Sequence, residues 1–193
     1  MKIFFLGGSF DPPHLGHFKI AEKFLKKCDL FLFIPAKRSP FKKNNPIASP
    51  SQRLRMLSFS RFISSKIKIE TFELKSKSPS YSYLTIEYLK RKYNPKELNM
   101  IIGRDNLNGL INWKNSKFIF QNCNIICLER DSINESYSKK YKNISFYKFD
   151  KKISSSNIRK LFKNNKKGQW KKLLDQKVLD FIIKNKIYIK NIY

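Results

Sequence analysis

Short apolar runs alternate with stretches of helical periodicity along most of the chain. The runs are continuous, which is typical of strands covered on both faces, and they occupy residues 2–6, 30–35, 67–72, 98–102, 124–128 and 145–149. Between them, apolar residues recur at helical spacing after residue 17, over 51–62 and over 82–93. This β–α–β order predicts an α/β fold with a doubly wound parallel sheet and right-handed crossovers.

The pattern changes after residue 149, where only helical periodicity remains. It predicts helices over 155–162, 170–174 and 178–185. No stretch has the length and composition of a linker, and 193 residues suit one domain with a full core. We therefore expect a single domain over residues 1–193 that ends in C-terminal helices.

Composition supports a folded chain in a reducing compartment. Hydrophobic residues make up 41% and aromatic residues 15%, which favours a globular protein over a disordered one. No apolar run approaches the roughly 20 residues of a membrane helix, and Met1 leads into a strand instead of a signal peptide. Cys123 and Cys127 lack zinc-knuckle spacing, so with Cys28 they are predicted to be reduced and buried in a cytoplasmic chain, with no residue assigned to a metal.

The formal net charge of +27 favours phosphate-bearing partners. A basic module that binds nucleic acid is one interpretation of this charge. The lysines, however, do not gather in one tail or along one helix face, and dispersed charge is the weaker form of a nucleic-acid footprint. Charge alone therefore does not decide the partner.

A segment rich in glycine and histidine follows the first predicted strand. Gly7 and Gly8 let the backbone approach a phosphate, and the helix that follows presents free N–H groups to an anion. His14 and His17 are spaced to share one face of the first helical turn, and Gly16 leaves room for a flat ligand such as a purine. The residue types predict a nucleoside triphosphate site that is neither a P-loop nor a Gly-x-Gly-x-x-Gly loop.

Two segments near the second and fourth strands carry further candidate chemistry. A proline-bracketed basic loop over residues 35–43 suits a substrate phosphate, or is an ordinary surface loop. Residues 78–85 place hydroxyls at a helix start, where Ser80 or Ser82 is also a plausible N-cap.

Two later segments are also candidates for ligand binding. Gly103 and Asp105 follow a strand and suit ribose or base recognition, while Trp113 either stacks on a ring or covers the core. Ser155 and Arg159 belong to a serine-rich helix start that forms a second anion cradle, unless the serines only cap the helix and the arginine is solvated.

Taken together, these motifs resemble a known family. Gly-Gly-Ser-Phe-Asp-Pro-Pro-His-Leu-Gly-His with Ile-Ser-Ser-Ser-Asn-Ile-Arg is similar to the nucleotidyltransferase superfamily marked by His-x-Gly-His and Ser-Ser/Thr-x-x-Arg. Ser-Pro-Ser-Tyr-Ser, Ile-Ile-Gly-Arg-Asp-Asn-Leu and Asn-Trp-Lys resemble the bacterial nicotinate-nucleotide adenylyltransferases. The resemblance implies a Rossmann-like fold and transfer of the adenylyl group of ATP, with Mg²⁺, to nicotinate mononucleotide. The products would be deamido-NAD and pyrophosphate, in NAD biosynthesis.

The resemblance also implies residue roles. The catalytic set is His14, His17 and Arg159. Beside these three, ATP would be contacted by Gly7, Gly8, Ser9, Phe10, Gly16, Gly103, Asp105, Ile153, Ser155 and Ser156. The second substrate would be contacted by Lys42, Ser82, Thr85, Trp113 and Lys114, the last standing where relatives commonly have Tyr. The substrate phosphate would attack ATP in line, without a protein nucleophile.

Three matters stay open on the sequence. Sister adenylyltransferases act on nicotinamide mononucleotide or phosphopantetheine, and the first of these is hard to separate from the nicotinate enzyme by residue type. A nucleic-acid-binding module is the reading from a different class, although it leaves the His-x-Gly-His loop without a purpose. Whether the chain forms a homo-oligomer is not decided.

Overall fold

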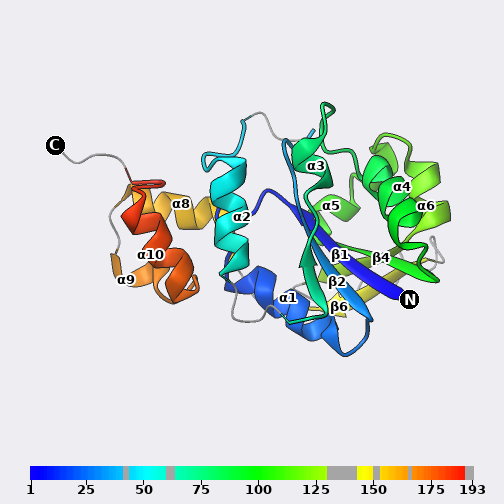
Figure 1. The fold of residues 1–193 in the computed structure, drawn as a ribbon, viewed down its shortest axis with the longest axis horizontal. Helices are drawn as coiled ribbons and strands as arrows, with labels where there is room; N and C mark the ends of the chain where they lie inside the picture. Colours follow the sequence, from blue (N-terminus) through cyan, green and yellow to red (C-terminus); the bar gives the residue numbers. More distant parts are fainter. Residues whose placement is uncertain (41–43, 60–63, 130–142, 150–152, 165–166, 190–193) are drawn as a thin grey trace.

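One parallel sheet organises the computed structural model, which describes residues 1–40, 44–59, 64–129, 143–149, 153–164 and 167–189. The described strands follow the order β3-β2-β1-β4-β5-β6, and every neighbouring pair is parallel (Figure 1). Their bounds are β1 Lys2–Gly8, β2 Leu30–Pro35, β3 Ile67–Ile69, β4 Glu97–Gly103, β5 Asn124–Glu129 and β6 Ile144–Lys148. The strand order reverses direction at β1, so a crevice is expected outside the carboxyl ends of β1 and β4.

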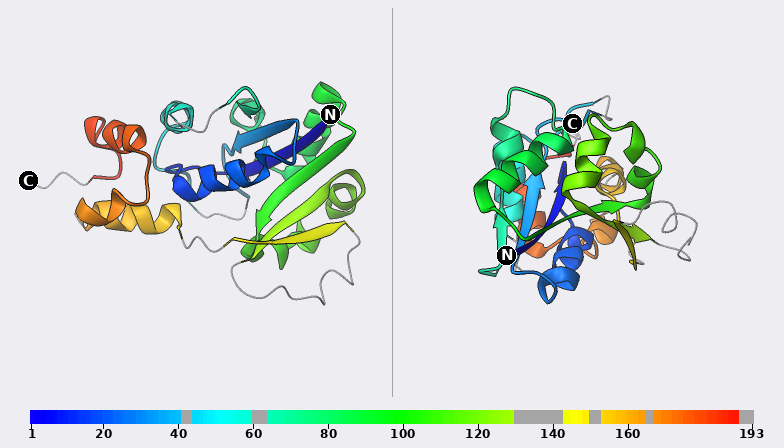
Figure 2. Two further views of the ribbon diagram at one scale, coloured as in Figure 1. Left: turned by 90° about the horizontal axis from the view of Figure 1, so that it is seen from below. Right: turned by 90° about the vertical axis from the view of Figure 1, so that its right-hand side faces the viewer.

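Helices cover both faces of the sheet, as the predicted doubly wound fold requires. They are α1 Leu15–Leu25, α2 Pro50–Ser58, α3 Phe72–Lys75, α4 Ser82–Tyr93, α5 Arg104–Leu107 and α6 Ser116–Asn122, with a 3₁₀ turn, η1, over Leu110–Asn112. Successive strand residues point to opposite faces. On β1, Phe4 packs on Phe24 of α1 with 5.2 Å between ring centroids, whereas Phe5 joins the cluster of Ile86 and Leu89 of α4. Helices lie on both sides of the sheet (Figure 2), and each face has its own hydrophobic cluster.

A third hydrophobic cluster lies beyond the sheet. It is built from α8 Ser155–Lys163, α9 Lys167–Trp170 and α10 Gln176–Lys184, which gather beside α2 at the end of the molecule far from the N-terminus (Figure 1). Met56 of α2 is fully buried in this cluster, so α2 links the C-terminal helices to the sheet. In the described part of the chain, no helix has the length and apolar character needed to cross a membrane.

Several predicted boundaries are wrong, each for a local reason. The strand expected over 67–72 ends at Ile69, and α3 begins at Phe72 because the Thr71 carbonyl accepts the N–H groups of Leu74 and Lys75 at 3.1 and 3.2 Å. The helix expected over 170–174 ends at Trp170, whose carbonyl accepts the Leu173 N–H in a turn. The helix expected over 51–62 ends at Ser58, and residues 60–62 lie outside the described ones.

Other elements escaped prediction, namely α3, α5, η1 and α6. All of them are short, between three and seven residues, so their apolar periodicity is too brief to detect. By contrast, the predictions for β2 and α4 are confirmed to the residue. Cys28, Cys123 and Cys127 are free and buried, as expected.

Candidate active site

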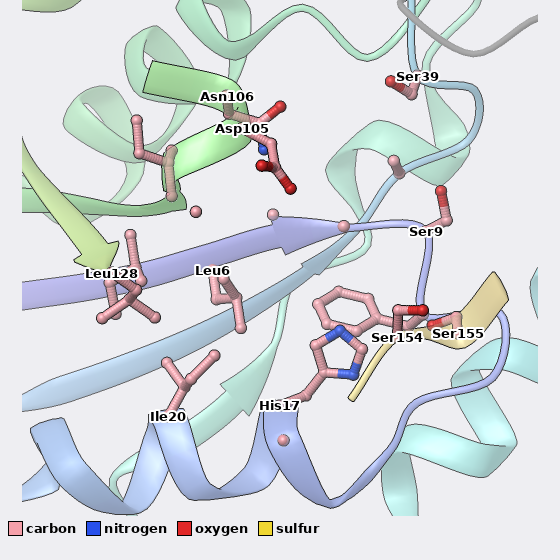
Figure 3. Close-up of a pocket in the computed structure, with 18 of the residues that line it drawn as sticks. Leu6, Ser9, His17, Ile20, Ser39, Asp105, Asn106, Leu128, Ser154 and Ser155 are labelled. Carbon is pink, nitrogen blue, oxygen red and sulfur yellow. The ribbon is translucent and has the colours of Figure 1, made fainter. Parts of the chain in front are cut away.

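A cavity of about 880 Å³ opens at the carboxyl ends of the strands, between β1, β4 and the start of α8. It brings together residues from both ends of the sequence. In Figure 3, Leu6, Ile20 and Leu128 form an apolar end, and Ser9, His17, Ser154 and Ser155 form a polar end. The predicted site residues that line it are Gly7, Gly8, Ser9, Phe10, His14, Gly16, His17, Ser82, Thr85, Gly103, Asp105, Trp113, Ile153, Ser155, Ser156 and Arg159.

Two of the predicted site residues are not among those lining the cavity. The Lys114 ammonium lies 4.8 Å from the ring centroid of Tyr81, in a cation–π contact. Its role toward the substrate stays a prediction. Lys42 lies outside the described residues.

The loop after β1 is held in an unusual conformation by a buried aromatic ring. Phe10 has φ 47°, in the left-handed region, and is 2% exposed. Its ring meets Phe33 edge-on at 5.6 Å and His17 at 4.8 Å. A Cβ at Gly8 would lie 3.4 Å from this ring, so glycine there lets the loop close over Phe10. Packing offsets the backbone strain and sets the position of His17.

The two histidines form a stacked pair with 3.6 Å between ring centroids. The His14 backbone N–H donates to Nδ1 of His17 at 3.2 Å, so a neutral His17 carries its proton on Nε2. Burial lowers the pKa of His14 from 6.5 to about 3, and His14 is therefore neutral at physiological pH. The pair can thus offer a fixed N–H donor without taking up a second proton at His14.

Gly16 makes room for an imidazole as well as facing the cavity. A Cβ at this position would lie 3.0 Å from Nδ1 of His14 and 3.6 Å from Cβ of Ile153. The His14 ring therefore occupies the space that a side chain at this position would take, while the glycine backbone still lines the cavity. Any larger residue would displace the ring.

Asp11 joins three separate segments of the chain. Its carboxylate is 3% exposed and accepts the backbone N–H groups of Ile47 and Ala48, each at 2.9 Å. The Tyr188 hydroxyl donates to the same carboxylate at 2.6 Å, from near the C-terminus. The sequence analysis assigned Asp11 no role, and only its place inside the glycine–histidine loop could have drawn attention to it.

Helix α8 is fastened to the same loop by two side chains. Ser155 Oγ donates to the Pro12 carbonyl at 2.9 Å, and Arg159 donates to the Asp11 carbonyl at 2.6 Å. The alternative of a solvated Arg159 is therefore wrong, because its guanidinium is bound to the loop and its side chain is only 28% exposed. Ser154 caps α8 by accepting the Asn157 N–H at 3.2 Å. The N-termini of α1 and α8 thus meet beside the histidines, where both dipoles attract anions.

Arg53 of α2 fixes the loops that follow β1 and β2. Its guanidinium donates to the carbonyls of Ser9 and Ala36, both at 2.7 Å, and the residue is 1% exposed. The sequence analysis missed this residue, since an arginine within an amphipathic helix normally faces solvent. Arg53 places the polar end of the cavity relative to β2.

At the opposite side of the cavity, hydroxyls surround a buried carboxyl group. Thr85 Oγ1 donates to Glu73 at 2.6 Å, and both residues line the cavity with Ser82. The N-cap of α4 is Tyr81, so the prediction that Ser80 or Ser82 caps the helix is wrong. Ser80 instead accepts the Lys37 N–H at 3.0 Å, which joins the helix start to β2.

Gly103, Asp105 and Trp113 complete the wall on the β4 side. Gly103 ends β4 directly before α5, where Asp105 projects toward the cavity (Figure 3). Trp113 packs against the core cluster under α4, which confirms the alternative that it covers the core, and it also lines the cavity. Arg104 forms an ion pair with Glu129 at the end of β5, which joins the two strand ends beside the cavity.

Comparison with known proteins defines the class. Residues 5–161 match the family model described as cytidylyltransferase-like. A protein of Methylacidiphilum infernorum named probable nicotinate-nucleotide adenylyltransferase is 36% identical, covering 98% of this chain and 93% of that protein. A protein of the same name from Hydrogenobaculum is also 36% identical, with 99% and 100% covered. The Plasmodium falciparum nicotinic acid mononucleotide adenylyltransferase complexed with NaAD has a TM-score of 0.80 at 26% identity, covering 97% of each chain.

The family model covers most of the chain, which is therefore a cytidylyltransferase-like protein. The relatives that share a third of their residues extend over nearly the whole of both chains. This chain therefore belongs to the family of the nicotinate-nucleotide adenylyltransferases.

We predict that Asp11→Asn lowers the free energy of unfolding by about 2–3 kcal/mol, because the amide N–H₂ would face one of the two backbone N–H donors, that of Ile47 or the buried one of Ala48. Tyr188→Phe removes one hydrogen bond and should lower it by about 1 kcal/mol. Urea unfolding followed by circular dichroism measures both. Two variants as stable as the original protein would show that these contacts do not hold the segments together.

We further predict that His14 makes stability fall with acid. The unfolded chain protonates this ring at about pH 6.5 and the folded protein only at about pH 3, so the folded state binds fewer protons between these values. From pH 7 to pH 5 the loss attributable to His14 is about 2 kcal/mol. His14→Gln should narrow the difference in unfolding free energy between the two pH values by this amount. Parallel pH curves for the two proteins would contradict the neutral His14.

Proposed function

We propose that this chain transfers the adenylyl group of ATP to nicotinate mononucleotide, giving deamido-NAD and pyrophosphate in NAD biosynthesis. The observation that carries the proposal is the single cavity in which the glycine–histidine loop, the start of α8 and the Thr85–Trp113 wall meet. The relatives named above support the same reaction. A nucleic-acid-binding module would need no such enclosed site, and the dispersed lysines do not call for one.

The polar end of the cavity suits the triphosphate. His17 offers its Nε2–H, Arg159 supplies charge, and the N-termini of α1 and α8 add backbone donors and positive dipoles. Gly8 and Ser9, with Phe10 beneath them, form the loop that lies along the phosphates. Ser155 and Ser156 lie at the start of α8, where they can bind the outer phosphates of ATP. The His14 ring stacks on the His17 ring and holds it in place.

The other walls suit the nucleosides. Gly103, whose Cβ position has no atom within 4 Å, permits close approach of the ATP ribose, and Asp105 can accept its hydroxyls. Ile153 and Gly16 bound the base on the opposite side. Trp113 offers a ring for stacking on the nicotinate, whose carboxylate then faces Ser82 and Thr85.

The reaction needs no protein nucleophile. The substrate phosphate is anionic at neutral pH and can attack the α-phosphorus of ATP in line, with pyrophosphate leaving on the far side. The chain contributes position and charge stabilisation, which are the main sources of acceleration in such transfers. His17 is the donor best placed for the α-phosphate, because Phe10 and His14 hold its ring from two sides.

Magnesium fits this site as a companion of ATP. Among the described residues there is no group of three or more His, Cys, Asp or Glu side chains placed to hold a metal ion. Mg²⁺ is commonly bound through substrate phosphates with few protein ligands, where it neutralises their charge. We therefore propose that it arrives with the triphosphate. The free, buried cysteines suit a reducing compartment, and we place the reaction in the cytoplasm.

Pyrophosphate release tests the proposed reaction. The enzyme is incubated with ATP, Mg²⁺ and nicotinate mononucleotide, in parallel with nicotinamide mononucleotide and with phosphopantetheine. We expect turnover with the nicotinate nucleotide to exceed that with phosphopantetheine by orders of magnitude. Turnover with phosphopantetheine alone would overturn the proposed substrate assignment. Pyrophosphate release with none of the three would overturn the proposed reaction.

We predict that His17→Ala lowers kcat by about 10²–10³, equivalent to about 2–4 kcal/mol, as for the loss of one preorganised donor to a reacting oxygen. His17→Gln, which returns an N–H donor near the position of Nε2, should recover part of the loss. Steady-state kinetics with saturating ATP measures kcat, and circular dichroism checks that both variants are folded. Near-normal turnover in His17→Ala would remove this histidine from the mechanism.

A further inference from the structure

Glu73 places a carboxyl group in the corner of the cavity that faces the proposed nicotinate site. The residue lies in α3 and is 7% exposed, and Thr85, 1% exposed, lies against it. Thr85 Oγ1 donates to Glu73 Oε1 at 2.6 Å. The Ser80 hydroxyl also hydrogen-bonds to Glu73 while accepting the Lys37 N–H at 3.0 Å. A second acid at this place matters, because the substrate is itself an acid.

The hydrogen bonds to Glu73 determine whether the Thr85 and Ser80 hydroxyls can still donate a hydrogen bond to a ligand. A threonine hydroxyl has one hydrogen and two lone pairs. When Glu73 is ionised, Thr85 and Ser80 spend their hydrogens on it, and toward the cavity they can only accept. A ligand carboxylate, which also only accepts, then finds no donor in these two hydroxyls, whereas the N–H₂ of a carboxamide finds an acceptor. When Glu73 carries a proton, Glu73 can donate to Thr85 Oγ1, and the threonine hydrogen is released for the ligand.

The surroundings favour the protonated state of Glu73. Among the described residues it has no ion-pair partner. Burial raises its pKa, and the hydrogen bonds from Thr85 and Ser80 counteract this only in part. Charged and titratable side chains on the neighbouring elements are engaged elsewhere or exposed. Lys37 binds the Ser76 carbonyl, and Lys92 binds Glu70 and Tyr88. Lys75 and Glu87 are exposed. A ligand carboxylate in the corner would add a like charge and favour the proton further.

We propose that Glu73 is the positioning residue that selects between acid and amide substrates, acting through the Thr85 hydroxyl. With its proton the site accepts nicotinate mononucleotide, and without it the site accepts nicotinamide mononucleotide. This inference rests on the proposed adenylyl transfer and adds the determinant of its substrate class. It further requires that the nicotinate nucleotide binds together with a proton when Glu73 is ionised in the free enzyme.

The test is the ratio of kcat/KM for nicotinate mononucleotide to kcat/KM for nicotinamide mononucleotide, measured from pH 5.5 to pH 9.5. Both substrates carry the same phosphate, so titration of that phosphate and of the histidines cancels in the ratio. In the original protein we expect the ratio to fall with rising pH, by up to about tenfold per pH unit above the pKa of Glu73. Glu73→Gln keeps an acceptor and supplies donors at all pH values, so its ratio should stay high and flat.

Glu70→Gln is the matched control. Glu70 is also a buried acid on the same side of the sheet, but it binds Lys92 and is not among the residues that line the cavity. This variant should keep the falling ratio of the original protein. Calorimetry of nicotinate mononucleotide binding above the pKa, in buffers of different ionisation enthalpy, should show uptake of about one proton. It needs no variant, so the inference can be tested even if Glu73→Gln does not fold.

The outcomes separate this inference from the function it rests on. A ratio that is independent of pH in the original protein, or one that falls equally in Glu73→Gln, overturns the inference and leaves the adenylyl transfer intact. Preference of Glu73→Gln for the amide nucleotide, or binding of the nicotinate nucleotide without proton uptake, overturns it as well. Absence of turnover with both nucleotides overturns the proposed function itself.

Discussion

The geometry of the site depends on the buried carboxylate of Asp11 and on the chain segments that this carboxylate joins. Asp11 accepts hydrogen bonds from the backbone before α2 and from a tyrosine near the C-terminus, while its own carbonyl accepts one from Arg159. These contacts tie the loop after β1 to the C-terminal cluster, which otherwise touches the sheet mainly through α2. A buried carboxylate is stable only when its acceptor capacity is used. Here the partners that use it come from segments that must be in place for the cavity to exist.

Around that anchor, the polar end of the cavity gathers positive potential from the backbone. The starts of α1 and α8 meet there, and Arg159 is the side-chain cation fastened between them. His14 adds no charge, since burial keeps it neutral, and serves as a packing support for His17. Fixed dipoles and a neutral donor can stabilise charge that develops on a phosphate without holding the product as strongly as a dense cluster of cations would. The net charge of +27 adds a general attraction for nucleotides.

The sequence predicts the elements and motifs whose signal is local, and it does not predict contacts between segments that lie far apart in the chain. Continuous apolar runs located all the strands of the described sheet within a few residues, and the motifs located the starts of α1 and α8 at the cavity. The role of Arg53 could not be read, because its carbonyl partners belong to loops whose positions follow only from the folded sheet. Glu73 was hidden by reading residues 67–72 as one strand, which left no helix to carry it. Thr85, predicted as a substrate contact, does line the cavity, but the direction of its hydroxyl depends on Glu73, which the sequence pattern does not place beside it.

The bond between Tyr188 and Asp11 also has a consequence for the order in which the molecule can be completed. Synthesis runs from the N-terminus, so the loop that carries Asp11 is made before its tyrosine partner, which lies 177 positions later in the sequence. The sheet strands all precede Tyr188 and can pair while the chain is still growing, but the loop lacks this contact until the tyrosine has been made. A chain that stops short of Tyr188 would therefore hold the sheet without the bond that ties the loop to the C-terminal cluster.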